Sequence, residues 1–190
     1  MNSAELFRRL ETVKPDQFGN LFKTMQTSAF RLEMLDFYTI PGEEEEFRQW
    51  KSGQKVPPEG SNQKWIDTVS ASVKRGVDFQ RVRLVREPVS EYLKFEVAWG
   101  YRLNIPAGEK TSCIFYKDKP AFTSQIPILK DFWLFDEERC YLLEYDFVGR
   151  FLGLNQVPSD HVAGYCELKK ELLSRANDIR KTPLWDFAQL

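Results

Sequence analysis

The sequence predicts an α+β fold, in which a mostly antiparallel sheet carries helices at both termini and between its strands. Apolar residues recur at helical spacing near both ends of the chain, and several short segments between them alternate with a period of two. In the second half, short turns join successive strand-like segments, as antiparallel neighbours allow. The 190 residues fit a single domain, residues 1–190, better than two small ones.

The helices are predicted from apolar stripes and from signals at their ends. In the segment 17–26, apolar residues fall at i, i+3, i+4 and i+7, and the side chain of Asp16 could cap the helix. The acidic run 43–46 suits a helix N-terminus because it meets the positive end of the helix dipole. We therefore expect helices over residues 3–11 and 17–26, after residue 43, over 62–75, over 88–103 and after residue 160.

Strands are expected where the apolar pattern has a period of two, and the last four of them should form a meander. The segment 88–103 fits either period. We interpret it as a helix because proline favours the first helical turn, and because a strand of this length without a turn would be long. The expected strands cover residues 28–38, 77–85, 112–118, 131–136, 139–146 and 147–157.

Composition narrows the classes of function. The formal net charge of -1 and pI of about 6.0 remove the simplest argument for a nucleic-acid binder, although a local basic patch stays open. The three cysteines are far apart and there is one histidine, which disfavours a zinc site, so we expect no cofactor. Free thiols, no secretory leader and no apolar run long enough for a membrane span indicate a cytoplasmic protein without a membrane partner.

Several segments together resemble an uncharacterised bacterial family, a domain of unknown function that is best represented in actinobacteria. Its members often resemble stand-alone versions of the effector regions of helix-turn-helix regulators, and the resemblance implies no particular catalytic mechanism. The segments that carry it are SAFRLEMLDFY (28–38), RGVDFQRVRLVREPVSEYLKFEVA (75–98), NIPAGE (104–109), DFWLFDEER (131–139) and EYDFVGRFLG (144–153).

The order of elements is also similar to that of the phospholipase-D-like sensor regions of such regulators. The catalytic version of that fold needs a histidine followed two residues later by a lysine. Here His161 is followed by Val162 and Ala163. The likeness therefore implies a shared topology without histidine-dependent phosphoryl transfer.

The arginines of the segment 81–86 are the leading candidates for a binding site. On a strand, Arg81 and Arg83 point to one face while Val82 and Leu84 point to the other. Guanidinium groups bind phosphate or carboxylate bidentately, so these arginines could hold an anion such as a nucleotide. Alternatively, they could pair with Glu33, Glu91 or Glu96 across a half-exposed sheet. The candidate ligand-binding residues are Arg81, Arg83 and Arg86, with Arg31, Glu33 and Tyr92 in support.

The leading hypothesis is thus a non-catalytic, cytosolic regulatory or effector module that binds a protein partner or a small anionic ligand. A second hypothesis is a Mg²⁺-dependent hydrolase or nuclease-type effector of a defence or toxin system. A third is a structural subunit whose oligomer interface includes the aromatic C-terminal tail around Trp185 and Phe187. The hydrolase would draw on Glu91, Glu96, Asp131 or Asp136.

Overall fold

An open sheet of eight strands forms the centre of the chain in the computed structural model, which describes residues 9–118, 120–124 and 126–189. The strand order is β1-β7-β6-β5-β2-β3-β4-β8. Among these strands, β2 pairs in parallel with β3 and β3 with β4, and the other neighbours are antiparallel, so the predicted fold class is confirmed. The strands are β1 (Glu11–Val13), β2 (Ser28–Glu33), β3 (Asp78–Arg86), β4 (Lys110–Tyr116), β5 (Phe132–Phe135), β6 (Arg139–Tyr145), β7 (Phe151–Gln156) and β8 (Asn177–Asp178).

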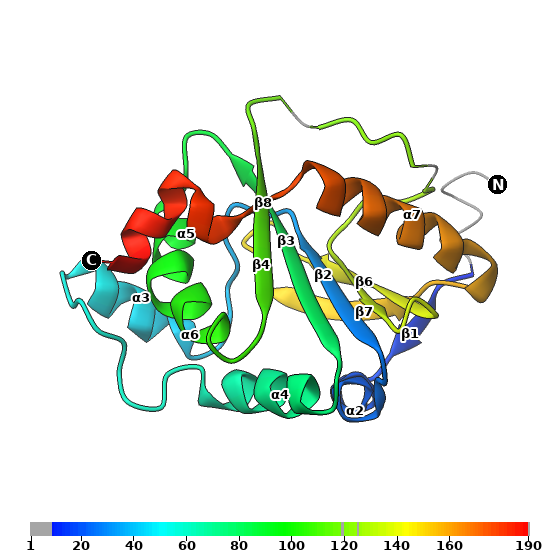
Figure 1. The fold of residues 1–190 in the computed structure, drawn as a ribbon, viewed down its shortest axis with the longest axis horizontal. Coiled ribbons are helices and arrows are strands. Elements are labelled where there is room, and N and C mark those ends of the chain that lie inside the picture. The colour runs from blue at the N-terminus through cyan, green and yellow to red at the C-terminus, as the bar shows by residue number, and fades with distance from the viewer. Residues whose placement is uncertain (1–8, 119, 125, 190) are drawn as a thin grey trace.

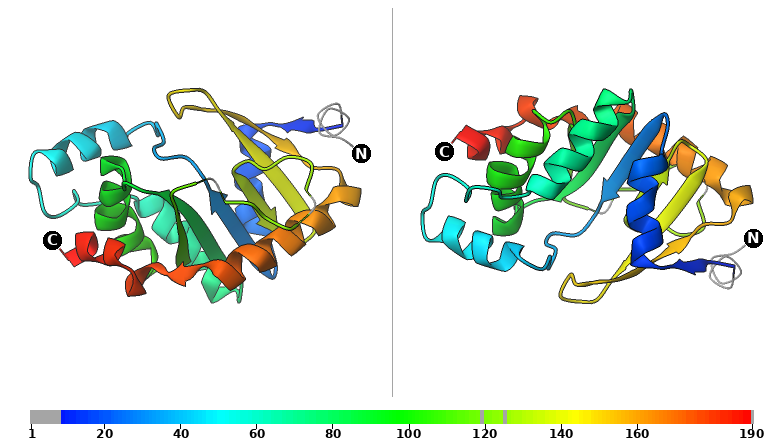
Figure 2. Two further views of the ribbon diagram at one scale, coloured as in Figure 1. Left: turned by 90° about the horizontal axis from the view of Figure 1, so that it is seen from above. Right: turned by 90° about the horizontal axis from the view of Figure 1, so that it is seen from below.

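Helices cover both faces of this sheet. α7 crosses one face, and α2 and α4 lie against the other (Figures 1 and 2). The helices are α2 (Pro15–Thr24), α3 (Glu43–Lys51), α4 (Gln63–Lys74), α5 (Glu91–Phe95), the π-helix η1 (Glu96–Tyr101), α6 (Arg102–Asn104), α7 (Ser159–Arg175), and the 3-10 helices η2 (Ile179–Lys181) and η3 (Pro183–Gln189).

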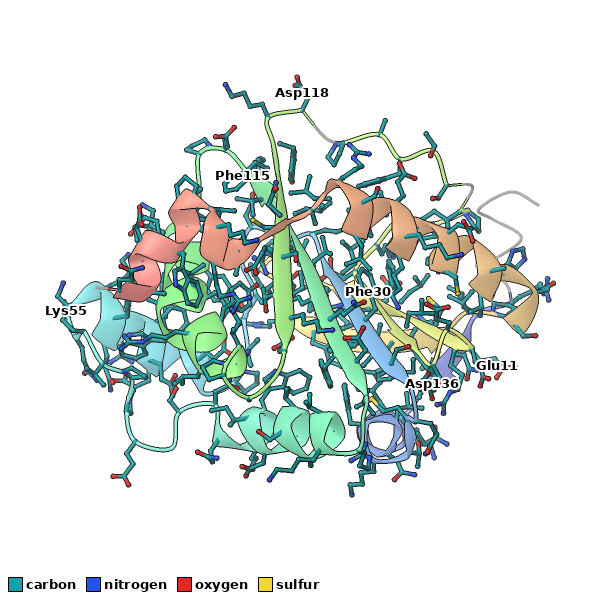
Figure 3. All side chains as sticks on the ribbon, viewed as in Figure 1. Glu11, Phe30, Lys55, Phe115, Asp118 and Asp136 are labelled. Atoms are coloured by element: carbon teal, nitrogen blue, oxygen red, sulfur yellow. The ribbon has the colours of Figure 1, made fainter. Side chains whose placement is uncertain are left out.

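The alternation of the strands decides what each face contains. Phe30 and Leu32 of β2 are fully buried in the cluster under α7, where Figure 3 shows Phe30 in the interior. Ala29 of β2 and Phe79 of β3 pack with α2 and α4 on the opposite face. Successive side chains point to opposite faces of a strand, so the charged residues between these apolar ones must lie on the face of α2 and α4.

The parallel pairs correct one prediction. We expected residues 112–118 to open an antiparallel meander, but β4 pairs in parallel with β3, on the side of β3 that faces away from β2. The helices α5, η1 and α6 return the chain to the same end of the sheet, which a parallel connection requires. The meander is instead formed by β5, β6 and β7, which pair in sequence order.

Three further predictions concern helix boundaries. Residues 3–8 of the expected first helix lie outside the described residues, and residues 11–13 form β1 against β7 instead of helix. α2 begins at Pro15, one residue before the expected cap, because proline is favoured in the first helical turn. A helix within 88–103 is confirmed as α5, η1 and α6, and its central turns are π-helical, but it begins at Glu91 after the N-cap Ser90, so Pro88 lies outside its first turn.

The C-terminal tail packs on the domain itself. Leu184 and Ala188 are buried against the cluster formed by β3, η1 and η2, and Trp185 and Phe187 pack beside them. These two aromatic side chains are half-buried, so the tail lies against the domain while part of each ring stays exposed. The β6–β7 hairpin also exposes large apolar side chains, and the exposed fraction of Phe147 is 94%.

Candidate functional site

Four of the predicted site residues come together where β2 and β3 run side by side. The parallel register places Arg31 beside Arg81 and Glu33 beside Arg83. All four side chains are buried, and Arg83 has no exposed surface. They lie on the face covered by α2 and α4, beyond its aromatic cluster. The alternation that predicted the direction of Arg81 and Arg83 is thus confirmed.

Glu33 is the centre of a buried ionic network. Its Oε2 accepts hydrogen bonds from the Arg83 guanidinium at 3.2 Å and from the Tyr101 hydroxyl at 2.9 Å. Its Oε1 accepts from Arg81 and lies 3.6 Å from Nε of Arg31. Burial alone would raise the pKa of Glu33, but the Arg81, Arg83 and Arg31 guanidiniums outweigh it and lower the pKa to about 2.

Two more carboxylates complete the charge balance of this network. Arg81 donates from Nε to Glu109 at 2.7 Å, and Arg31 donates from Nη2 to Asp131 at 2.9 Å. Arg83 also donates to the main-chain carbonyl of Leu35 at 2.6 Å. Three guanidiniums therefore face three carboxylates. The interpretation that the arginines pair within the chain is correct for Glu33, and the other acidic partners are ones the sequence analysis did not expect.

A cavity of about 300 Å³ lies over this network, between the sheet and the elements α3, α4 and η1. Trp99 and Arg31 line it, and each has a buried N–H donor, Nε1 and Nη1 respectively, without a hydrogen-bond partner in the described part of the chain. Its aromatic lining residues are Tyr38, Trp65, Phe95, Trp99, Trp133 and Tyr145. Its charged lining residues are Arg31, Glu33, Glu43, Glu46, Arg81 and Glu96.

Three of these carboxylates stand apart from the balanced network. Glu43 accepts a hydrogen bond from the Tyr92 hydroxyl at 2.9 Å, and Glu46 accepts one from the Ser61 hydroxyl at 2.7 Å. Glu96 lies over Gly100, where an added β-carbon would come within 3.4 Å of its Oε1. Within the described ranges, no basic side chain forms an ion pair with any of the three.

Two carboxyl groups of this cavity, those of Glu96 and Glu43, have raised pKa values. Burial raises the pKa of Glu96 to about 8, and the nearby charges of Glu43 and Glu33 add to the effect. Burial likewise raises the pKa of Glu43 to about 7, although its hydrogen bond from Tyr92 opposes the shift. Both groups therefore titrate near neutral pH, which is common at functional sites.

Sequence reasoning missed the part that α3 plays in this cavity. The acidic run from residue 43 was interpreted only as a helix N-terminus, a role that the structure also shows. Tyr92, a predicted site residue, lies behind Glu43 and contacts the cavity through it. Helical spacing is the signal that could have found them, because Glu43 and Glu46 share one face of α3 with Phe47 and Trp50, whereas their neighbours at 44 and 45 are exposed.

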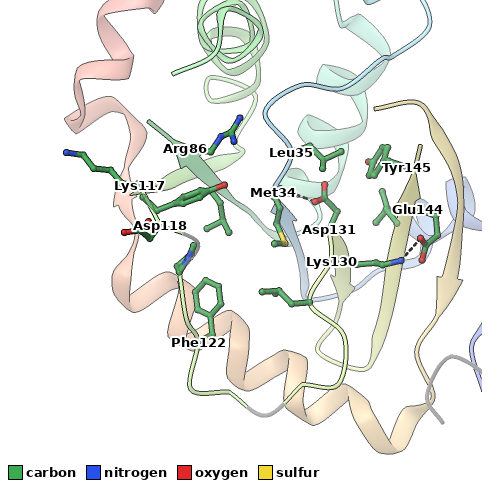
Figure 4. A pocket seen from close by; sticks show the side chains of 15 residues that line it. Met34, Leu35, Arg86, Lys117, Asp118, Phe122, Lys130, Asp131, Glu144 and Tyr145 are labelled. Carbon is green, nitrogen blue, oxygen red and sulfur yellow. Dashed lines mark hydrogen bonds and ion pairs between the residues drawn. The ribbon is translucent and has the colours of Figure 1, made fainter. Parts of the chain in front are cut away.

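Arg86 is the predicted site residue that lies elsewhere. It forms an ion pair with Asp36 and lines a second cavity, of about 600 Å³, at the carboxyl ends of β2, β3 and β4 (Figure 4). Lys130 lines the same cavity and pairs with Glu144, as the dashed line in Figure 4 marks. Crevices at the carboxyl ends of parallel strands are frequent ligand sites, but here each of these two cations has an acidic partner from the same chain.

The carboxylates considered for a metal site are distributed over the molecule. Glu91 pairs with Lys94 at the surface. Asp131 belongs to the arginine network, whereas Asp136 accepts hydrogen bonds from main-chain N–H groups at the start of β2. In the part of the chain that the structure describes, no group of three or more His, Cys, Asp or Glu residues is placed to hold a metal ion.

Fold and site together define a mixed α+β domain with a charged, aromatic cavity on one face of its sheet. The chain belongs to a family described as a domain of unknown function (DUF6879), whose model matches residues 16–182. This agrees with the family resemblance inferred from the segments above. The search of curated proteins found no match. None of the helices in the described residues is both long and apolar enough to cross a membrane.

Two solved structures are similar to this chain in fold. One is TrmBL2, an archaeal chromatin protein, with 14% identity and a TM-score of 0.43; the match covers 85% of this chain and 49% of TrmBL2. The other is NucT from Helicobacter pylori, with 10% identity and a TM-score of 0.45, covering 86% of this chain and 91% of NucT. This chain thus spans about half the length of TrmBL2. At these scores, neither similarity supports a function.

Proposed function

We propose that this domain is a non-catalytic module that binds a small molecule in the cavity over the arginine–glutamate network. The observation that carries the proposal is a preformed cavity in which aromatic side chains lie beside charged ones, a combination that is common in ligand sites. The volume of about 300 Å³ is at the lower end of the range for ligand pockets.

The ionic partners of the arginines change the expected ligand. Arg31, Arg81 and Arg83 are matched by carboxylates of the same chain, so the network presents no excess of positive charge. This pairing removes the electrostatic reason for expecting an anion at the cavity. Arg31, Arg81 and Glu33 instead form a buried floor on which a ligand would rest, and Arg83 supports this floor from beneath through Glu33.

The cellular setting is part of the same proposal. The cysteines at 113, 140 and 166 are free thiols, which favours a reducing compartment such as the cytoplasm. A regulatory role is what the family resemblance implies, and a binding cavity without a metal-binding cluster in the described residues is compatible with it.

Thermal-shift screening of a metabolite library tests the proposal. A ligand at a hundred times its Kd adds about 2.7 kcal/mol of stability, which is easily measured. Gly100 lines the cavity in a helical conformation, so Gly100→Leu should fill it and abolish the shift. Ala163→Leu, at an exposed site on α7, is the matched control and should retain the shift.

Two results would refute the binding function. One is a library in which no compound stabilises the wild-type chain. The other is a set of shifts that persist in Gly100→Leu. If Gly100→Leu does not fold, Trp99→Phe replaces a large aromatic side chain of the lining by a smaller one, so ligand affinity should fall at least several-fold in that variant.

A second candidate function is acid–base catalysis in the same cavity. The observation that favours it is the pair Glu43 and Glu96, whose pKa values of about 7 and about 8 suit proton transfer at neutral pH. If the domain is an enzyme, a compound that stabilises it should be converted to a product during prolonged incubation, as followed by NMR. Glu96→Gln should then stop the conversion. An unchanged compound excludes this candidate for that ligand and favours the binding module.

A further inference from the structure

We propose that the cavity selects an organic cation, whose ammonium or guanidinium group binds at the acidic rim. This inference rests on the proposed binding function and names the chemical class of the ligand. It reverses the sign of the charge that the arginine-rich sequence predicts. The charges, the free hydrogen-bonding capacity and the aromatic lining of the cavity support it.

The charges around the cavity favour a cation. The guanidiniums of the floor are balanced by Glu33, Glu109 and Asp131, as described above. The carboxylates of Glu43, Glu46 and Glu96 remain, and the described residues supply no basic partner for them. A bound cation would provide that missing partner, whereas an anion would be repelled by every ionised carboxylate at the rim.

The hydrogen-bonding groups left free at the rim are acceptors, which also favours a cation because cations carry donors. Glu43 and Glu46 each receive one hydrogen bond from a neutral hydroxyl, which leaves further lone pairs on each carboxylate. A primary ammonium has three donors and a guanidinium has five, so either group can bridge two carboxylates. The rim comes from two elements, α3 and η1, and a bridging cation would join them.

The aromatic lining suits an organic cation better than a hydrated metal ion. Trp65, Trp99 and Tyr145 line the cavity together with the carboxylates. Cations are attracted to the faces of aromatic rings, and aromatic cages with acidic residues are a recurrent way to bind ammonium groups. The described part of the chain also has no cluster of three or more metal-ligating residues at this place.

Binding of a cation must also displace protons. The pKa of Glu96 is raised by burial to about 8 and that of Glu43 to about 7, so at neutral pH this pair still holds a proton. A cation stabilises the ionised forms, and its affinity should therefore rise as the pH increases through 7 and 8. The charged and titratable groups that act on Glu96 are Glu43 of α3, Glu33 of β2, Arg81 and Arg83 of β3, and Tyr92 of α5.

Three para-substituted phenols of similar size test this inference, because their side chains end in a cation, a neutral methyl group or an anion: tyramine, 4-ethylphenol and 4-hydroxyphenylacetate. Each carries the same phenol, whose oxygen can accept a hydrogen bond. In calorimetric titrations at pH 8, we expect tyramine to bind at least ten times more tightly than 4-ethylphenol, and 4-hydroxyphenylacetate to bind least. Tyramine affinity should fall at least tenfold in Glu96→Gln and in Glu43→Gln, and stay unchanged in Glu44→Gln, an exposed neighbour on α3.

The outcomes separate the ligand class from the binding function. Equal or tighter binding of the neutral or anionic compound, lost in Gly100→Leu, would overturn the cation inference and leave the cavity as a binding site. Tyramine binding that is insensitive to Glu96→Gln, or no binding by any of the three compounds, would also overturn the inference. Proton release by wild-type chain on binding tyramine, measured in buffers of different ionisation enthalpy, should disappear in the double variant Glu43→Gln/Glu96→Gln.

Discussion

Neutralising Glu96 should stabilise the domain, and only at high pH. The group is half-buried beside Glu43 and over Gly100, and burial raises its pKa from 4.5 to about 8. A carboxyl whose pKa is higher in the folded state contributes stability that is complete below about pH 4.5. That contribution is lost as the pH rises to about 8. Gln has nearly the same shape and no charge to desolvate, so Glu96→Gln should escape this loss.

The size of the effect follows from the two pKa values. The difference between 4.5 and about 8 corresponds to about 5 kcal/mol, which is the upper limit for the gain at pH 8.5. Part of the Glu96 surface remains in contact with water, which screens the charge and lowers the expected gain to between about 2 and 5 kcal/mol. For a chain of 190 residues, each kcal/mol raises the melting temperature by about 2–4 °C.

Urea denaturation at pH 5.0 and at pH 8.5 measures this prediction. We expect the free energies of unfolding of wild type and Glu96→Gln to differ by less than about 1 kcal/mol at pH 5.0 and by about 2–5 kcal/mol at pH 8.5. Glu44→Gln, which changes an exposed carboxylate of α3, should show no such divergence. If the difference in free energy of unfolding between Glu96→Gln and wild type is the same at both pH values, or if the variant is less stable than wild type at pH 8.5, Glu96 does not lie in a desolvated acidic cavity.

Three other changes test separate parts of the structure by denaturation at pH 7. Glu33→Gln should destabilise by about 3–5 kcal/mol because it leaves the buried guanidiniums uncompensated, and a loss below 1 kcal/mol would contradict the network. Asp136→Asn should lower the free energy of unfolding by about 1 kcal/mol at pH 7, because one charged oxygen of Asp136 accepts hydrogen bonds from three main-chain N–H groups. The pKa of Asp136 is lowered in the folded chain, so the same stabilisation should be lost in acid. An unchanged stability at pH 7 would contradict this role. Gly19→Ala in α2 has open space around the added methyl and should stabilise by about 0.4–1 kcal/mol, whereas destabilisation would indicate different packing there.

Local patterns in the sequence determined the elements and the faces of the strands. The alternation of Val82 and Leu84 with Arg81 and Arg83 was sufficient to separate the α7 face from the charged face, because side-chain direction on a strand depends only on its period. The length of the segment likewise indicated a helix within 88–103, but proline did not mark its start, since Pro88 precedes the first turn at Glu91. Where local rules failed, as in the parallel placement of β4, the missing information was the path of the chain between strands.

Only the tertiary structure decided which charged side chains of the site are paired and which are left without a partner. Arg81 meets its carboxylate 28 residues away and Arg31 meets Asp131 at a separation of 100, so neither pairing has a local signal. Glu43 and Glu96 belong to different helices and influence one another only because both flank one cavity. The effect of a charged side chain in a folded protein depends on its distance from other charges and on its burial, and neither can be inferred from its neighbours in the sequence. That is why an arginine-rich strand could suggest an anion site while the folded chain presents excess carboxylates.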